Sequence, residues 1–217
     1  LEGHGKIDIF LDEKGDVAKC EARGADAVFI PSVEGMYPDG QRSTIKAGPL
    51  AAGLCGAKRP GHFDGVVTVV SRLFGIVKPD EAVFGEKDFQ QLRVIENMAA
   101  RLHPNIRIIG APIMREPDGL AMSSRNMYLN NDERKRATCL YRSLERAKKR
   151  VANGVRDADS IIESASAEIK NAGGRIDYID IVDAMNLRPI KEIRSSARML
   201  LAVYIGSTRL IDNTELI

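Results

Sequence analysis

The sequence is poor in the residue types on which several classes of function depend. It has no tryptophan, and aromatic residues make up 5% of its 217 residues. Proteins that hold single-stranded nucleic acids stack bases on aromatic side chains, so this composition argues against such a platform. The formal net charge of +2 is nearly balanced. It gives no reason to expect DNA, RNA or an anionic membrane as a partner.

Cysteine and long apolar runs are also scarce. The three cysteines, Cys20, Cys55 and Cys139, lie far apart and form no CxxC pair. This spacing argues against a zinc knuckle or a disulfide framework and suits a reducing, cytoplasmic compartment. No apolar run approaches the roughly 20 residues that span a bilayer, and no signal peptide opens the chain. We therefore expect neither a membrane nor a nucleic acid as a partner.

The first half of the chain alternates apolar strand-like runs with amphipathic helical patterns. Val66, Val69, Val70, Leu73 and Val77 follow helical spacing and stop before a proline. The full set of predicted elements comprises helices at 13–23, 66–77 and 89–102, strands at 27–30 (buried), 82–84 and 106–113, and a turn at 36–40. Strands joined by crossover helices predict a parallel α/β sheet.

The second half has a different pattern. Two charge-rich helices are predicted near 132–152 and 157–171, and strands follow at 178–182, 199–205 and 208–211. Helices followed by strands are typical of a separate, smaller α+β domain. The boundary is expected near Met114, which gives predicted domains of 1–113 and 114–217.

The segment FGEKDFQQL at 84–92 lies where a predicted strand ends and a helix begins. Ligands of open α/β sheets bind at the carboxyl ends of strands, where the first helical amides favour an anion. Gly85 permits a close backbone approach, Lys87 adds a positive charge, and Asp88 could accept hydrogen bonds from a ribose. The alternative is structural, since Asp88 and Gln91 have the spacing of a helix-capping box.

The segment DGLAMSSRN at 118–126 places two hydroxyls and an arginine beside a glycine-bearing turn. Serine and arginine are suited to hold phosphate oxygens, arginine through its forked donors. Ser123, Ser124 and Asn126 could equally be turn and cap residues ahead of the next helix. Local chemistry leaves both interpretations open.

A third segment, KRPGHFDG at 58–65, gathers Lys58, Arg59 and His62 before a helix start. It could be an anion site or a solvated face, and His62 could be an acid–base group or a packing residue. His103, before Pro104, is expected to be a structural residue at a helix end. No Walker loop, GxSxG elbow, Ser-His-Asp order or metal-ligand cluster is recognisable.

Together these segments resemble the pantoate–β-alanine ligase family from about Gly15 onward. The motifs occur in the family's order: IPSVEGMYPDG at 30–40, GPLAAGLCGAKRPGHFDGVVTVV at 48–70, KPDEAVFGEKDFQQL at 78–92, REPDGLAMSSRNMYL at 115–129 and GSTRLIDN at 206–213. The resemblance implies an α/β fold, with a Rossmann-like nucleotidyltransferase domain that is incomplete at its start and a smaller α+β domain.

The resemblance also implies a chemistry in which ATP and Mg²⁺ activate pantoate as an adenylate, which β-alanine then converts to pantothenate. The implied catalytic residues are Lys87, Ser123 and Arg125. The ATP site would comprise these three with Gly85, Glu86, Asp88, Met114, Met122 and Ser124. Pantoate would contact Gln91, Arg59, Val66 and Val69. A cytoplasmic homodimer is the family expectation.

The start of the chain departs from the family's pattern. The family carries an HxGH motif near its N-terminus, and here only Glu2-Gly3-His4 echoes it. We therefore expect a missing or altered N-terminal segment. Two alternatives remain open: another nucleotidyltransferase of the same superfamily, and a truncated nucleotide-binding form with impaired catalysis. The sequences FGEKDFQQL and MSSRN argue against another nucleotidyltransferase of the superfamily.

Overall fold

The computed structural model describes residues 12–37 and 44–217, and the chain divides into two compact units, Leu1–Arg42 and Ser43–Ile217. In the first unit the predicted helix at 13–23 is confirmed as α1 (Glu13–Glu21). Asp12 caps it by accepting a hydrogen bond from the Gly15 amide at 3.0 Å. Gly24 follows with φ of 76°, a left-handed conformation that glycine adopts without strain. A short helix, α2 (Val33–Met36), completes this unit.

The predicted buried strand at 27–30 is wrong. These residues form no strand, and Val28, Phe29 and Ile30 are 43%, 53% and 53% exposed. Their apolar composition signals burial, but a strand persists only where a neighbour satisfies its backbone groups. None of the described residues pairs with this segment. The predicted turn at 36–40 lies mostly outside the described residues, as does the HxGH-like Glu2-Gly3-His4.

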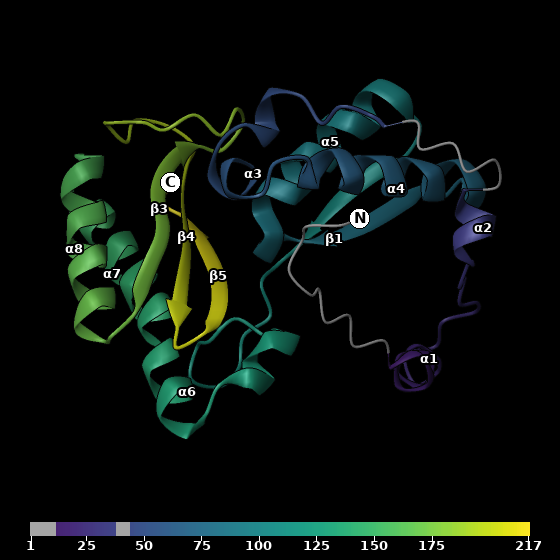
Figure 1. Ribbon diagram of the computed structural model, residues 1–217. Coiled ribbons are helices and arrows are strands. Elements are labelled where there is room, and N and C mark those ends of the chain that lie inside the picture. Colours follow the sequence, from purple (N-terminus) through teal and green to yellow (C-terminus); the bar gives the residue numbers. More distant parts are fainter. Residues whose placement is uncertain (1–11, 38–43) are drawn as a thin grey trace. The chain divides into compact units, whose positions relative to one another are not determined.

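The second unit begins with the helices that surround a parallel pair of strands (Figure 1). Strands β1 (Glu81–Gly85) and β2 (Arg107–Ala111) pair in parallel, with Val83 opposite Ile109. This confirms the predicted parallel α/β arrangement, and among the described residues the parallel sheet has these two strands. The preceding and intervening elements are η1 (Pro49–Ala51), α3 (Leu54–Lys58), α4 (His62–Val77), η2 (Glu86–Asp88) and α5 (Phe89–Leu102).

Helices α4 and α5 form where periodicity predicts them and end for identifiable reasons. Helix α4 stops at Val77 because Pro79 disfavours a helical residue before it. Lys78 adopts φ of 50° and its amide donates to the Phe74 carbonyl at 2.9 Å. His103 ends α5 as the predicted structural residue, and its Nε2 lies 2.7 Å from the Ser71 hydroxyl. The buried faces of both helices share one apolar cluster, which includes Val67, Phe74, Val94, Ile95 and Met98.

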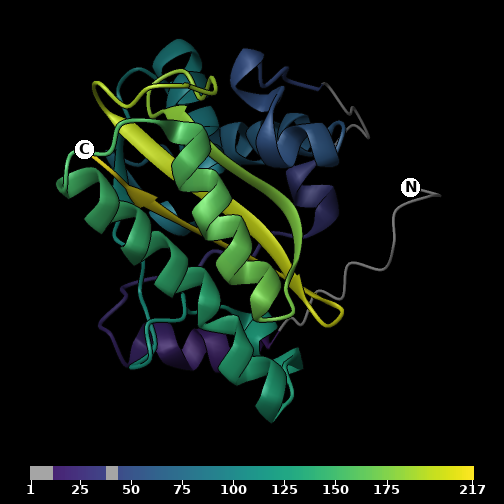
Figure 2. The ribbon, with the colours of Figure 1, turned by 90° about the vertical axis from the view of Figure 1, so that its left-hand side faces the viewer.

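The C-terminal part has the predicted α+β content, and its strands form an antiparallel sheet covered by helices. Strands β3 (Arg175–Asp183), β4 (Ala197–Ile205) and β5 (Thr208–Glu215) lie in the order β3-β4-β5. A short turn, η3 (Ser124–Tyr128), precedes helices α6 (Asn131–Ala137), α7 (Cys139–Ala152) and α8 (Ala158–Asn171). The predicted helix near 132–152 is therefore two helices, separated at Thr138. Figures 1 and 2 show α7 and α8 against one face of the sheet.

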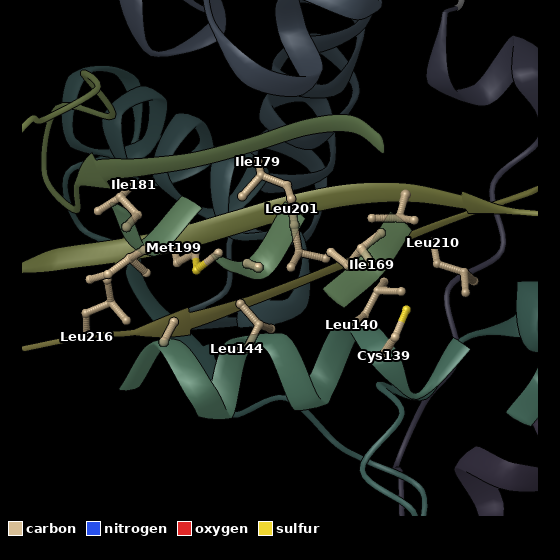
Figure 3. Packing of buried hydrophobic residues seen from close by; sticks show 14 of the residues in the cluster. Cys139, Leu140, Leu144, Ile169, Ile179, Ile181, Met199, Leu201, Leu210 and Leu216 are labelled. Atoms are coloured by element: carbon tan, nitrogen blue, oxygen red, sulfur yellow. The ribbon is translucent and has the colours of Figure 1, made fainter. Parts of the chain in front are cut away.

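The main apolar core lies between those helices and the sheet (Figure 3). Leu140 and Leu144 of α7 point toward Met199 and Leu201 of β4, and all four are at most 1% exposed. The opposite face of the sheet packs on the first half of the unit, where Leu200 and Val182 share a cluster with Phe89 and Leu92 of α5. Central strand β4 is thus buried on both faces. Its neighbour β5 contacts η2, in the turn between β1 and α5. In residues 12–37 and 44–217, no helix is long and apolar enough to cross a membrane.

Candidate active site

The turn between β1 and α5 carries the first predicted segment. The strand ends at Gly85, the 3₁₀ turn η2 holds Glu86, Lys87 and Asp88, and α5 begins at Phe89. Asp88 occupies the N-cap position of α5, but its side chain accepts no capping hydrogen bond. The capping-box interpretation of Asp88 and Gln91 is therefore wrong. Asp88 is exposed and Gln91 half-buried, and neither side chain forms a hydrogen bond within the described residues.

Lys87 differs from the other lysines of this unit in its burial. Burial lowers the pKa of Lys87, and the nearby Arg125 cation lowers it further, whereas Asp88 and Asp212 act in the opposite direction. Its ammonium forms no hydrogen bond or ion pair with any described residue. A half-buried cation without a bonded partner is costly unless an anion completes its surroundings.

The second predicted segment forms a turn that is held by hydrogen bonds of its own side chains. Ser123 accepts a hydrogen bond from the Arg125 amide at 3.2 Å and starts η3. Asn126 donates to the Glu116 carboxylate at 2.7 Å and to the Ala121 carbonyl at 3.2 Å, so Asn126 has the structural role that remained open. Ser124 and Arg125 are exposed, and the Arg125 guanidinium contacts no described acidic group. This turn places Arg125 near Lys87.

The two segments, some 30 positions apart in sequence, line one pocket. Lys87 contributes from the β1–α5 turn, Ser123 and Arg125 from the serine-containing turn, and Asp212 from β5. A further charged group of the lining, Arg209, is neutralised by Asp177, whose Oδ2 lies 3.0 Å from Nε and 2.9 Å from Nη2.

Two methionines assigned to the ATP site, Met114 and Met122, lie beside this turn. The Met114 carbonyl accepts a hydrogen bond from the Met122 amide at 2.9 Å, so that carbonyl is already engaged. Both side chains are exposed, Met114 by 70% and Met122 by 54%. They form an accessible apolar surface next to the pocket-lining residues 123 and 125.

The residues assigned to pantoate lie on α3, α4 and α5. Arg59 ends α3, and its Nη1 is 3.1 Å from Nε2 of His62, the first residue of α4. Burial lowers the pKa of His62, and the Arg59 cation lowers it further, while Asp88 raises it. Neutral Nε2 can accept a hydrogen bond from Arg59, which agrees with that direction. Val66 packs against the α4–α5 cluster, and Val69 is half-buried.

A polar framework behind the β1–α5 turn was not predicted. Asn213 donates hydrogen bonds to the Glu86 and Lys87 carbonyls at 2.9 and 3.0 Å. Arg198 donates to the Glu86 carboxylate at 3.2 Å from both terminal nitrogens, and to the Asn213 side-chain oxygen at 2.8 Å. The sequence signal was present, since Asp212-Asn213 is a polar pair within the β5 strand.

The charges around the pocket indicate what it can bind. Asp212 is paired with Arg115. Burial raises the pKa of Asp212, although the hydrogen bonds that Arg115 donates act in the opposite direction. Lys87 and Arg125 are therefore two mutually repelling cations, and neither forms an ion pair with a described acidic residue. Such a pair is suited to stabilise an anion with distributed charge, such as a phosphate chain.

Comparisons with known proteins agree on one family. A family model described as pantoate-beta-alanine ligase matches residues 11–215. A pantothenate synthetase from Trichlorobacter lovleyi is 48% identical over 204 residues, which is 94% of this chain and 72% of that protein. One from Myxococcus xanthus is 47% identical over 208 residues, 94% of this chain and 71% of that protein.

Solved structures give the same result. The crystal structure of pantothenate synthetase from Thermus thermophilus matches with a TM-score of 0.91 and 39% identity, over all of this chain and 79% of that one. A Francisella tularensis pantoate-beta-alanine ligase, complexed with beta-gamma ATP and beta-alanine, matches with a TM-score of 0.75 and 33% identity. That match covers 94% of this chain and 70% of the other.

Proposed function

The chain belongs to the pantoate–β-alanine ligase family, and on that premise we propose that it adenylates pantoate with ATP and condenses the product with β-alanine. In the first step a pantoate carboxylate oxygen bonds to the α-phosphorus of ATP, and the bond from that phosphorus to pyrophosphate breaks. In the second step the β-alanine amine bonds to the acyl carbon, loses a proton, and expels AMP. The products are pantothenate, AMP and pyrophosphate.

One observation carries this proposal: Lys87 and Arg125, from segments distant in sequence, line the same pocket without bonded acidic partners among the described residues. The transition state of the first step gathers negative charge at the α-phosphate and on the departing pyrophosphate. Fixed cations aimed at that charge accelerate the reaction because they need no reorganisation as it develops. Lys87 and Arg125, with the Ser123 hydroxyl as a hydrogen-bond donor, are the proposed catalytic residues. The chain needs no covalent nucleophile for this role.

The remaining site residues are assigned by proximity to that pocket. Gly85, Glu86 and Asp88 would border the nucleotide on the β1–α5 turn. Met114 would offer backbone groups to the adenine, and Met122 and Ser124 would lie beside the phosphates. Pantoate would lie toward Gln91, whose amide forms no hydrogen bond within residues 12–37 and 44–217. Arg59, Val66 and Val69 would form the border beyond it.

Mg²⁺ is part of the proposal as a companion of the nucleotide. Residues 12–37 and 44–217 contain no group of three or more His, Cys, Asp or Glu side chains arranged for a metal ion. The side chains present there therefore do not form a metal cage of their own. Mg²⁺ commonly reaches nucleotide sites on substrate phosphates with most of its water retained.

We also propose a homodimer in the cytoplasm. Two apolar side chains at the end of α4, Ile76 and Val77, are 48% and 53% exposed, which supports a contact with a second copy. Cys20, Cys55 and Cys139 are unpaired thiols, which suits a reducing compartment. Analytical ultracentrifugation gives the oligomeric state directly, and a monomer at all concentrations would contradict the proposed dimer.

One assay tests the proposed function. Pantoate-dependent exchange of labelled pyrophosphate into ATP measures the first step, and AMP release after addition of β-alanine measures the second. We expect both, in that order. Exchange that requires an acceptor other than pantoate would indicate a different nucleotidyltransferase. ATP binding without exchange would indicate an impaired nucleotide-binding form.

A further inference from the structure

Asn213 contacts the backbone on both sides of Lys87. Its Nδ2 donates one hydrogen bond to the Glu86 carbonyl at 2.9 Å and another to the Lys87 carbonyl at 3.0 Å. These carbonyls belong to the two peptide units that flank the Lys87 Cα. Because each peptide unit is planar, fixing both units fixes the backbone dihedral angles of Lys87. The direction in which the Lys87 side chain leaves the backbone is thereby set.

Arg198 determines which way the Asn213 amide faces. Its Nη1 donates to Asn213 Oδ1 at 2.8 Å, so the amide nitrogen must face the turn. The same guanidinium donates to the Glu86 carboxylate at 3.2 Å and lies 3.9 Å above the Phe89 ring centroid. Arg198 and Asn213 are 8% and 2% exposed. The framework is therefore buried and rests on strands β4 and β5.

The framework forms hydrogen bonds with the backbone of the turn and with Glu86, but not with the Lys87 ammonium. The Glu86 carboxylate and both carbonyls are satisfied by it, whereas the Lys87 ammonium has no bonded partner in the described residues. The structure thus uses two buried polar side chains to orient a residue whose own charged group makes no bond within that part of the chain. We propose that Asn213 and Arg198 are positioning residues that aim Lys87 at the phosphates of ATP. This inference rests on the proposed function.

If Asn213 acts by positioning Lys87, the effect of an Asn213 substitution on activity must require the Lys87 ammonium. A loss of stability would lower activity whether or not Lys87 is present. A reacting group displaced by about 1 Å can cost about 100-fold in rate. We expect Asn213→Ala to lower pantoate-dependent pyrophosphate exchange roughly 10- to 100-fold. In a Lys87→Ala background, where no ammonium remains to be aimed, the same substitution should lower exchange by less than about threefold. Arg198→Met should show the same non-additivity.

The matched control removes one buried methylene far from the turn. Ile161→Val, in α8, which packs on β3, lowers the melting temperature and should leave exchange within about twofold. Equal losses from Asn213→Ala in both backgrounds would overturn the positioning role. So would a loss of exchange in Ile161→Val as large as that in Asn213→Ala.

A second variant covers the case in which Asn213→Ala does not fold. Arg198→Met leaves the Asn213 side chain in place and removes the guanidinium that orients its amide, and the same non-additivity is expected. Wild-type protein without pantoate-dependent exchange would refute the proposed function instead. In that case the dissociation constant of ATP is measured for the two single variants and the double variant. Non-additive effects of the Asn213 and Lys87 substitutions on this constant support positioning, and additive effects overturn it.

Discussion

The Asp212 carboxylate accepts two hydrogen bonds from one guanidinium, since Arg115 Nη1 lies 2.7 Å from Oδ2 and Nη2 lies 3.0 Å from Oδ1. The Asp212 side chain is 1% exposed and that of Arg115 is 23% exposed. The pair joins the segment that leads into the serine-containing turn to strand β5. It therefore links the two sides of the pocket through the ion pair that engages the Asp212 charge.

Removing Arg115 should destabilise the fold strongly. Arg115→Met leaves a buried carboxylate without its partner, and breaking a buried pair in this way costs about 3 kcal/mol or more. Urea unfolding should show this loss, while the double variant Arg115→Met/Asp212→Leu should recover a large part of it. Removal of the exposed Glu192 from its pair with Arg194 is the control and should change stability little. Equal effects in the two pairs would contradict the stated role of burial.

Lys87→Ala should separate catalysis from folding. The loss of one positioned charge from a transition-state site typically costs about 10²–10³ in rate. We expect pantoate-dependent pyrophosphate release to fall on that scale with an unchanged circular dichroism spectrum. Lys148→Ala, which removes an exposed lysine of α7 outside the pocket, is the matched control. Near wild-type pyrophosphate release by Lys87→Ala would refute the assignment of Lys87.

Arg125 should contribute to binding of the departing anion. Pyrophosphate that binds the folded protein raises its melting temperature, and the rise grows with its affinity. We expect a clear rise for wild-type protein and about 10- to 100-fold weaker pyrophosphate binding for Arg125→Ala, since charged hydrogen bonds contribute about 1.5–3 kcal/mol. Arg125→Lys should retain part of the shift because it keeps the charge but loses the fork. An unchanged shift in Arg125→Ala would place pyrophosphate elsewhere.

His62 should make stability depend on pH on the acidic side. Its folded-state pKa lies below the ordinary value of 6.5, chiefly because of burial. Between that ordinary value and the lowered folded-state pKa, the unfolded chain binds the extra proton, so stability falls as pH falls through this window. His62→Gln should flatten that part of the curve of melting temperature against pH. An identical curve for the variant would show that His62 does not contribute.

The elements predicted correctly are those whose signal is local. Helix α5 repeats apolar residues at Leu92, Ile95 and Ala99, and α4 stops at a proline, so neither depends on distant contacts. Both turns of the pocket were also predicted to carry the chemistry, and the structure brings them together at one pocket. Their meeting depends on how β5 pairs with β4, which a local pattern does not specify.

The framework behind Lys87 was missed because its partners are distant in sequence. The predicted strand at 208–211 stopped before the polar pair Asp212-Asn213, but β5 continues to Glu215. Their burial is possible only because Arg115 and Arg198 satisfy them from remote parts of the chain. The wrong strand at 27–30 has the converse cause, since its apolar pattern does not supply a pairing partner.

The hydrogen bonds that Asn213 donates also determine when the turn can form. They connect residues that are 127 and 126 positions apart, and loop closure over such a distance delays folding. At a synthesis rate of about 5–20 residues per second, roughly 6–25 seconds pass on the ribosome between the appearance of Lys87 and that of Asn213. During this interval the Asn213 donors do not yet exist, so these two hydrogen bonds form only after residue 213 has been synthesised.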